Sequence, residues 1–150
     1  MVNQWFFSVG ESGTIINTLY SKAREKFLEG SIDWVNDDIK AILVHTTGYI
    51  VDILSDEFLS DIPEISIVAT SDNLSGKTIS DGVANASDVQ FPLVNGDTVE
   101  AVVLFKDTGN SATSPLLVYI NTVLNGVPIT LDGGNITIQW DNGTNKIFKL

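Results

Sequence analysis

The chain has 150 residues, a length that fits one domain, and 43% of them are hydrophobic, as in ordinary folded proteins. It holds no cysteine, which excludes disulfides and thiolate metal sites. Its formal net charge is −11, and a surface of that sign repels phosphate backbones, so we expect no nucleic-acid partner.

The first ten residues are apolar and aromatic, and they predict either a strand or an extended arm, residues 1–13, that packs on a neighbour. No basic residue precedes Trp5 and no long apolar run follows it, so we expect no secretion signal. No stretch has the length needed to span a bilayer, so we expect no membrane partner. Synthesis in the cytoplasm is the expectation that remains.

The segment Thr14 to Glu29 has the pattern of an amphipathic helix. Apolar residues from Ile16 to Phe27 recur at helical spacing and form one stripe. Gly30 follows as a natural C-terminal stop. The pattern predicts one α-helix near the N-terminus.

Beyond Gly30 the chain consists of short runs rich in strand-forming residues, with one short helical turn at Ser55–Leu59. The predicted strands are Ile39–His45, Tyr49–Leu54, Ile65–Thr70, Lys77–Ile79, Val89–Phe91, Thr98–Lys106, Leu116–Asn121, Val127–Thr130, Ile136–Trp140 and, at a sheet edge, Lys146–Leu150. Turn pairs such as Asp81-Gly82 and Asn95-Gly96 separate these runs. We predict a mainly β fold, a jelly-roll-like β-sandwich with one N-terminal α-helix, in a single domain over residues 1–150.

No catalytic constellation is evident in the sequence. The single histidine, His45, lies in a predicted strand, and no Gly-x-Ser-x-Gly elbow occurs. The densest acidic group, Asp52 to Glu64, is weak as a signal in so acidic a chain and is typical of a solvated edge. We predict no catalytic residues and no enzymatic activity. A small hydrolase that works through the Asp52–Glu64 acids is the enzymatic alternative.

Metal and cofactor motifs are also missing. The turns Asp132–Asn135 and Asp141–Asn145 carry oxygen ligands, but neither has the spaced set ending in a glutamate that an EF-hand needs. Both are typical of hairpin turns. No Walker loop or dinucleotide fingerprint occurs. We predict no metal site and no cofactor.

The aromatic residues near the N-terminus are candidates for an interface. Trp5, Phe6 and Phe7 are consecutive, and neighbouring side chains of a strand point to opposite faces, so at least one ring faces away from the core. Exposed aromatic clusters mark interfaces. Ile147 and Phe148, in the predicted C-terminal strand, complete the candidate interface.

Several segments resemble a family of small virion structural proteins of tailed bacteriophages. They are Asn17–Ile39, Glu57–Pro63, Leu74–Gly82, Phe105–Gly109 and Asp141–Leu150. None of them is a catalytic motif, and the resemblance brings no functional residues with it. It implies a component of the phage head that acts as a cement or decoration protein.

Under this resemblance, the chain binds the assembled head and stabilises it by bridging neighbouring capsid subunits. The expected partners are the major capsid protein and further copies of the chain, as a dimer or trimer. The expected place is the head surface of the virion, after synthesis in the host cytoplasm. The alternative is a tail-associated host-recognition or carbohydrate-binding module, which the three Trp and the turn-rich β pattern favour.

Overall fold

The computed structural model describes residues 2–6, 18–121, 131–140, 143–144 and 146–150, and for residues 2–6 it describes the backbone alone. These described residues form eleven β-strands, one α-helix and four short 3-10 turns. The predicted fold class, mainly β with one N-terminal α-helix, is confirmed.

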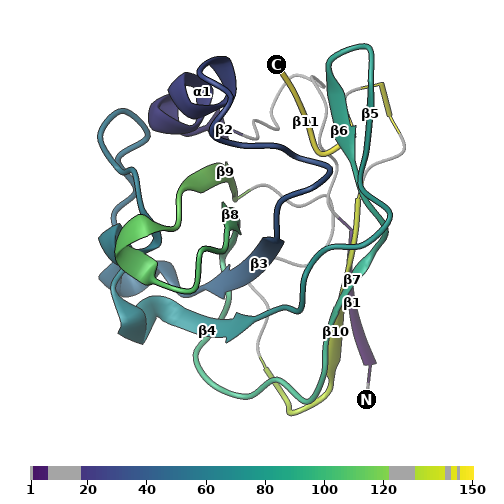
Figure 1. The fold of residues 1–150 in the computed structure, drawn as a ribbon. Helices are drawn as coiled ribbons and strands as arrows, with labels where there is room; N and C mark the ends of the chain where they lie inside the picture. The colour runs from purple at the N-terminus through teal and green to yellow at the C-terminus, as the bar shows by residue number, and fades with distance from the viewer. Residues whose placement is uncertain (1, 7–17, 122–130, 141–142, 145) are drawn as a thin grey trace.

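The strands form three sheets (Figure 1). The largest is antiparallel, in the order β2 (Thr18–Leu19), β9 (Leu116–Ile120), β8 (Ala101–Lys106), β3 (Ile39–Val44) and β4 (Ile67–Thr70). The second has the order β1 (Val2–Phe6), β10 (Asn135–Gln139) and β7 (Val89–Phe91), with β1 parallel to β10. The third, called here the small sheet, has the order β11 (Phe148–Lys149), β6 (Val83–Asn85) and β5 (Thr78–Ser80).

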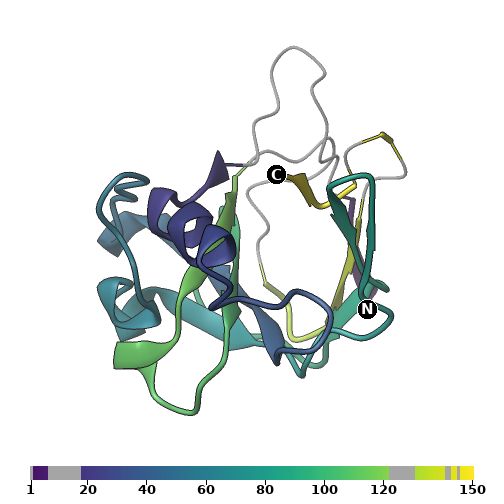
Figure 2. The same cartoon turned by 45° about the horizontal axis from the view of Figure 1, so that its top comes forward.

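One face of the five-stranded sheet packs against the two three-stranded sheets, as in a sandwich (Figure 2). Leu43 and Leu104 point into this layer from β3 and β8, and Phe91 and Ile138 meet them from β7 and β10. The prediction of a sandwich is therefore confirmed. The prediction also describes the sandwich as jelly-roll-like. The strand order shows a feature that the sequence does not predict, which is that the second layer consists of two separate sheets.

The other face of the five-stranded sheet is covered by the helix α1 (Ser21–Leu28) and by the loops that follow β3. Ile42 and Val103 point to this side, where they pack with Tyr20 and Ala23. Because β3 and β8 are buried on both faces, their sequences are apolar except for Lys40 and Lys106 near the strand ends and show no polar alternation.

A β-bulge adjusts β9 to this double burial. The register between β8 and β9 shifts between Leu104 and Phe105, which leaves Leu117 without a directly opposed residue. Leu116 consequently faces the α1 side, while both Leu117 and Val118 face the sandwich core. An extra residue of this kind lets two successive side chains enter one core.

The helix is shorter than the sequence predicts. It spans Ser21–Leu28, because Thr18 and Leu19 of the predicted span pair with β9 as a strand. Residues 14–17 of that span lie outside the described residues. Helical spacing of apolar residues does not show that a segment has a strand partner far along the chain. The predicted stop is confirmed, since Gly30 adopts a φ of +80° directly after the helix.

The predicted strand Tyr49–Leu54 is wrong. This segment is a loop, because side chains take up its backbone hydrogen bonds. Asp52 accepts a hydrogen bond from the Leu54 N–H (3.1 Å), and Asp56 accepts one from the Asp52 N–H (2.9 Å). The predicted helical turn lies later, at Leu59–Asp61. The predicted strand Val127–Thr130 lies outside the described residues.

The Asp81-Gly82 turn is the clearest local success of the sequence patterns. Both residues have positive φ, 52° and 78°, as a type I′ turn requires. The turn joins β5 to β6 and sets Ile79 opposite Ala84. The sequence predicted β5 and the turn, but it did not predict β6.

Candidate protein interface

The acidic group Asp52–Glu64 serves its own loop. The Asp56 carboxylate accepts hydrogen bonds from the Tyr49 hydroxyl (2.7 Å) and from the loop backbone. Asp61 accepts bonds from the N–H groups of Glu57 (2.8 Å) and Phe58 (2.9 Å). The pKa of Asp52 is lowered, chiefly by a hydrogen bond from the Ser55 side chain. These carboxylates bind the backbone and side chains of their own segment and so hold the loop in its shape.

Two buried tyrosines link this loop to the helix. The hydroxyls of Tyr20 and Tyr49 lie 3.0 Å apart, and the Tyr49 hydroxyl donates a further hydrogen bond to the Asp56 carboxylate. Burial raises the pKa of both tyrosines, so both are neutral over the physiological pH range. Lys26 adds an ion pair with Glu57 (2.7 Å), which ties α1 to the same loop.

His45 is a structural residue. Its Nδ1 lies 2.6 Å from the Thr98 carbonyl, which accepts, so Nδ1 carries the proton. The pKa of His45 is raised, first by this backbone hydrogen bond and then by the charge of Glu100, whose carboxylate lies 3.3 Å away. Glu100 in turn accepts a hydrogen bond from the Thr46 N–H (2.9 Å). The group joins the end of β3 to the segment before β8.

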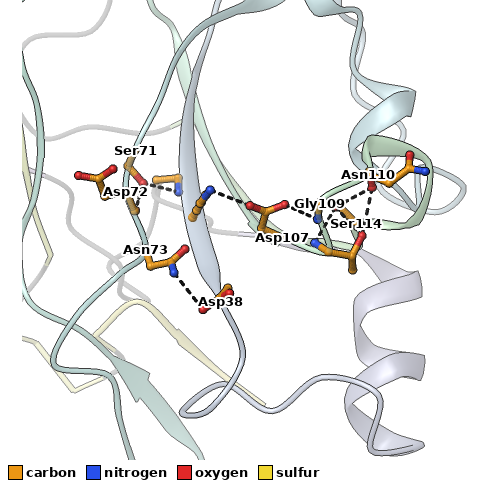
Figure 3. A network of polar contacts seen from close by, with 11 residues as sticks. Asp38, Ser71, Asp72, Asn73, Asp107, Gly109, Asn110 and Ser114 are labelled. Atoms are coloured by element: carbon orange, nitrogen blue, oxygen red, sulfur yellow. Dashed lines mark hydrogen bonds and ion pairs between the residues drawn. The ribbon is translucent and has the colours of Figure 1, made fainter.

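A second polar network holds β3 at its other end (Figure 3). Lys40 pairs with Asp107 (2.7 Å), and Asp107 also accepts the Gly109 N–H (2.8 Å), which lowers the pKa of Asp107. Ser71 accepts the Ala41 N–H (2.9 Å) from the neighbouring segment. Figure 3 shows Asn73 reaching Asp38 and Ser114 reaching Asn110 in the same network. These contacts fix loops to the sheet.

The described residues hold no group of three or more His, Asp or Glu side chains placed to bind a metal ion. In the Asp132–Asn135 turn, the Asp132 carboxylate accepts the Gly134 N–H (2.9 Å), as a turn residue does. Most of Asp141–Asn145 lies outside the described residues. In the part of the chain that the structure describes, no helix has the length and apolar character needed to cross a membrane.

Two of the predicted interface residues are buried in the single chain. Ile147 is fully buried and Phe148 is 6% exposed, and both belong to the sandwich core. The cause is a local turn that the sequence does not reveal. Lys146 adopts a φ of +44°, after which the Ile147 N–H donates to the Ala84 carbonyl (3.1 Å) and both apolar side chains enter the core.

The N-terminal candidates are only partly described. Residues 2–6 form β1, whose Trp5 lies opposite Ile138 of β10, so this segment is a strand of its own chain. The strand alternative is thus confirmed for these residues, and the arm is not. The side chains of Trp5 and Phe6 are not described, and Phe7 lies outside the described residues.

The structure shows a candidate interface that the sequence does not predict, which is an apolar groove beside the small sheet. It has a volume of about 320 Å³ and lies between the end of α1, the loop after it and the small sheet. Its apolar lining includes Phe27, Ile32, Trp34, Ile79, Phe148 and Leu150.

The floor of the groove is rigid. Trp34 packs edge-on against Phe148 with ring centroids 5.2 Å apart, and Phe27 lies 5.7 Å from the same ring. The Trp34 indole N–H donates to the Asn85 carbonyl (3.1 Å), which fixes the ring against β6. Rings held by both packing and a hydrogen bond keep the groove in one shape.

The rim of the groove is exposed and carries charge. Ile79 and Leu150 are each 57% exposed, although both are large and apolar. Asp33 lines the groove, and hydrogen bonds from Asn36 lower the pKa of its carboxyl, so it is ionised at neutral pH. An exposed apolar rim next to a fixed charge is typical of a protein interface.

Beside the groove, β5 forms the free edge of the small sheet. All three of its residues are exposed, and no strand lies beyond it among the described residues. Edge strands of this kind are templates for pairing with another chain. The predicted Asp81-Gly82 turn was the sequence signal for this edge, but nothing in the sequence showed that Trp34 and Phe27 face it.

Comparison of the chain with protein-family models and with curated proteins finds no match.

Proposed function

We propose that the chain is a cement or decoration protein of a phage head. It binds the assembled shell and stabilises it by bridging neighbouring subunits of the major capsid protein. The observation that carries the proposal is the presence of exposed apolar side chains on both sides of the five-stranded sheet. A protein that bridges capsid subunits needs one surface for the shell and a second surface for another subunit or for another copy of the chain.

The first surface is the groove and the free edge of the small sheet, on the sandwich side. The second, called here the loop set, consists of Ile50, Leu54 and Ile65, which are between 75% and 92% exposed. These residues belong to the loops whose other side chains, such as Val51 and Ile53, pack on the α1 side of the sheet. The two surfaces thus lie on opposite sides of a common core.

The core between the two surfaces is stiff. Ile42, Val103 and Leu104 are fully buried in the central strands, and the polar contacts of Lys40 and His45 tie both ends of β3 to other segments. Close-packed interiors transmit strain instead of absorbing it. A rigid body that binds only the assembled shell lowers the free energy of that state and stabilises it.

Neither alternative function gains support from the described residues. Two of the acids in Asp52–Glu64, Asp56 and Asp61, accept hydrogen bonds from their own loop. A carbohydrate-binding module needs exposed aromatic platforms, but Trp34 and Trp140 are 2% and 6% exposed. Each of these two indoles donates its N–H to a backbone carbonyl of the same chain.

The proposal is tested on phage particles prepared with and without the protein. We expect depleted particles to release DNA at a lower temperature, and added purified protein to restore the original temperature. Release is measured with a DNA-binding dye during heating. If depleted and intact particles release DNA at the same temperature, the proposed function is wrong.

A matched pair of variants tests the loop set. Ile65→Asp places a charge where we expect contact with the shell, so this variant should fail to restore the release temperature. Leu93→Asn alters another exposed aliphatic residue, at a φ of 50° that asparagine tolerates, and should restore the release temperature fully. Equal restoration by both variants would exclude the loop set as the shell contact.

A further inference from the structure

We propose that the free edge of the small sheet binds a second copy of the chain, with β5 of each copy paired antiparallel to β5 of the other. The two small sheets then form one continuous six-stranded sheet. This inference rests on the proposed function only for its purpose, because a dimer carries two loop sets and can therefore bridge two capsid subunits. The pairing itself follows from the backbone, the apolar side chain and the charges of β5.

The backbone of β5 offers one donor and one acceptor at its centre. Ser80 and Val83 flank a two-residue hairpin loop and so form a hydrogen-bonded pair, which makes Ile79 and Ala84 a non-hydrogen-bonded pair. The Ala84 carbonyl agrees with this alternation, since it accepts a bond from Ile147 on the β11 side. The N–H and C=O of Ile79 therefore point to the free edge.

A two-fold axis through Ile79 satisfies both groups. When Ile79 of one copy lies opposite Ile79 of the other, the two residues exchange two N–H···O=C bonds, as an antiparallel ladder requires. Their side chains then lie on the same face, which is the groove face. Ile79, which is 57% exposed in the single chain, becomes covered by its own equivalent.

In this register, a positive charge of each copy lies close to a negative charge of the other copy. Lys77 precedes β5 and Asp81 opens the turn that follows it, so in this register the Lys77 end of each copy lies beside the Asp81 turn of the other. The ammonium of Lys77 donates to the Asp37 carbonyl, and an ammonium has two further donors for an approaching carboxylate. Opposite charges in facing positions of a sheet stabilise pairing, and the symmetric contact makes the pair twice.

The other charges near the edge set the strength of the contact. Asp33 lines the groove, and its equivalent in the second copy brings a like charge to the same face. Lys149 follows Phe148 in β11, so its side chain lies on the face away from the groove. A contact of three residues per strand with this charge balance is weak, and we expect a dimer that depends on protein concentration. Attachment to a shell raises the local concentration and favours the pairing.

A charge-swap experiment tests the pairing. Lys77→Glu places a second carboxylate against Asp81 and should abolish dimers, and Asp81→Lys should abolish them by placing two ammonium groups together. Lysine is accepted at the positive φ of this turn position, as it is at Lys146. An equimolar mixture of the two variants restores both opposite-charge pairs and should dimerise again. Sedimentation velocity over a range of protein concentrations measures each sample.

Three further samples complete the test. Ile79→Pro removes the outward N–H without touching the bonds to β6 and should leave a monomer. Glu64→Gln changes an exposed acid on the α1 side and should dimerise like the unaltered chain. In the mixture of charge variants, we expect a dimer fraction about tenfold higher than in either variant alone.

The inference is overturned if the unaltered chain stays monomeric at every concentration, if Ile79→Pro still dimerises, or if the mixed variants remain monomers. These outcomes are separate from a failure of the proposed function. Monomeric protein that still restores the heat stability of depleted particles would reject the pairing and keep the cement role. A dimer that leaves particle stability unchanged would reject the role and keep the pairing.

Discussion

The five-stranded sheet and the small sheet use the same kind of structure for different purposes. Every side chain of β9 is buried, as are five of the six in β8, and both faces of their sheet are covered. By contrast, β5 has only three residues, all of which are exposed. The strand β11 has only two residues, of which Lys149 is exposed. One sheet removes apolar surface from water, whereas the other leaves backbone groups and an isoleucine available for contact.

The comparison shows how stability and interaction are separated in this chain. The large sheet has long strands with bonds on both sides, so a partner has nothing to add to its centre. The small sheet is anchored through Trp34 and Phe148 at one end and free at the other. Substitutions in the two sheets should therefore have very different effects, which the following predictions measure in order of size.

The largest effect is expected from Leu104→Ala in β8. Leu104 is fully buried in the sandwich core, and its truncation leaves a cavity that costs about 2–5 kcal/mol of unfolding free energy. Urea unfolding measures the change. A loss below about 1 kcal/mol would show that the large sheet is not the stabilising unit.

A smaller effect is expected from Trp34→Phe at the groove floor. The change removes the N–H that bonds the Asn85 carbonyl and should cost about 1–3 kcal/mol. Amide hydrogen exchange should rise in β5 and β6. Trp140→Phe, which removes the equivalent bond to the Ser87 carbonyl, is the matched control and should leave β5 exchange unchanged. Equal exchange of β5 in both variants would contradict the anchoring role of Trp34.

The polar network of β3 predicts a pH-dependent effect. Lys40 holds the pKa of Asp107 below its usual value, so this contact stabilises the fold above about pH 4 and stops doing so as the pH falls through the lowered pKa. Asp107→Asn should cost no more than about 1 kcal/mol at pH 7, because the pair is partly exposed. The difference between variant and unaltered chain should vanish in acid. A constant difference at all pH values would exclude the ion pair as the cause.

The smallest effect on stability is expected from Ile79→Thr. The side chain is largely exposed and threonine keeps the β-branched shape, so unfolding free energy should change by about 0.5 kcal/mol or less. Thermal unfolding at low protein concentration, where the chain is monomeric, is the measurement. A large loss would mean that β5 is part of the folding core and is not a free edge.

The sequence predicted the large sheet well because its strands are long and buried on both faces. The run Thr98–Lys106 contains β8, and Ile39–His45 contains β3, with errors of a few residues at the ends. An uninterrupted apolar run is a strong signal for a strand of this type. The Asp81-Gly82 turn was equally readable, since its positive φ angles demand such residues.

The failures have a common cause in long-range pairing. Thr18 and Leu19 lie in a strand and not in the predicted helix, because they pair with β9, about one hundred residues away along the chain. Tyr49–Leu54 has strand composition, but the carboxylates of Asp52 and Asp56 accept its backbone N–H groups and form a loop. The local pattern of apolar residues does not show whether a segment has a strand to pair with.

The interface was the least predictable feature. Alternation in the last five residues suggested an exposed edge with Ile147 and Phe148 as contacts, but the positive φ of Lys146 turns both inward. β11 does lie at an edge of the small sheet, as predicted, and β5 forms the other edge. The local pattern does not show that Phe148 packs on Trp34 across the fold.

The most direct test of the proposed role is a reconstruction of the phage particle at residue resolution. We predict pairs of copies on the head, joined at β5, with the loop set Ile50, Leu54 and Ile65 against neighbouring capsid subunits. A chain found on the tail, or on the head with the loop set facing solvent, would contradict the account.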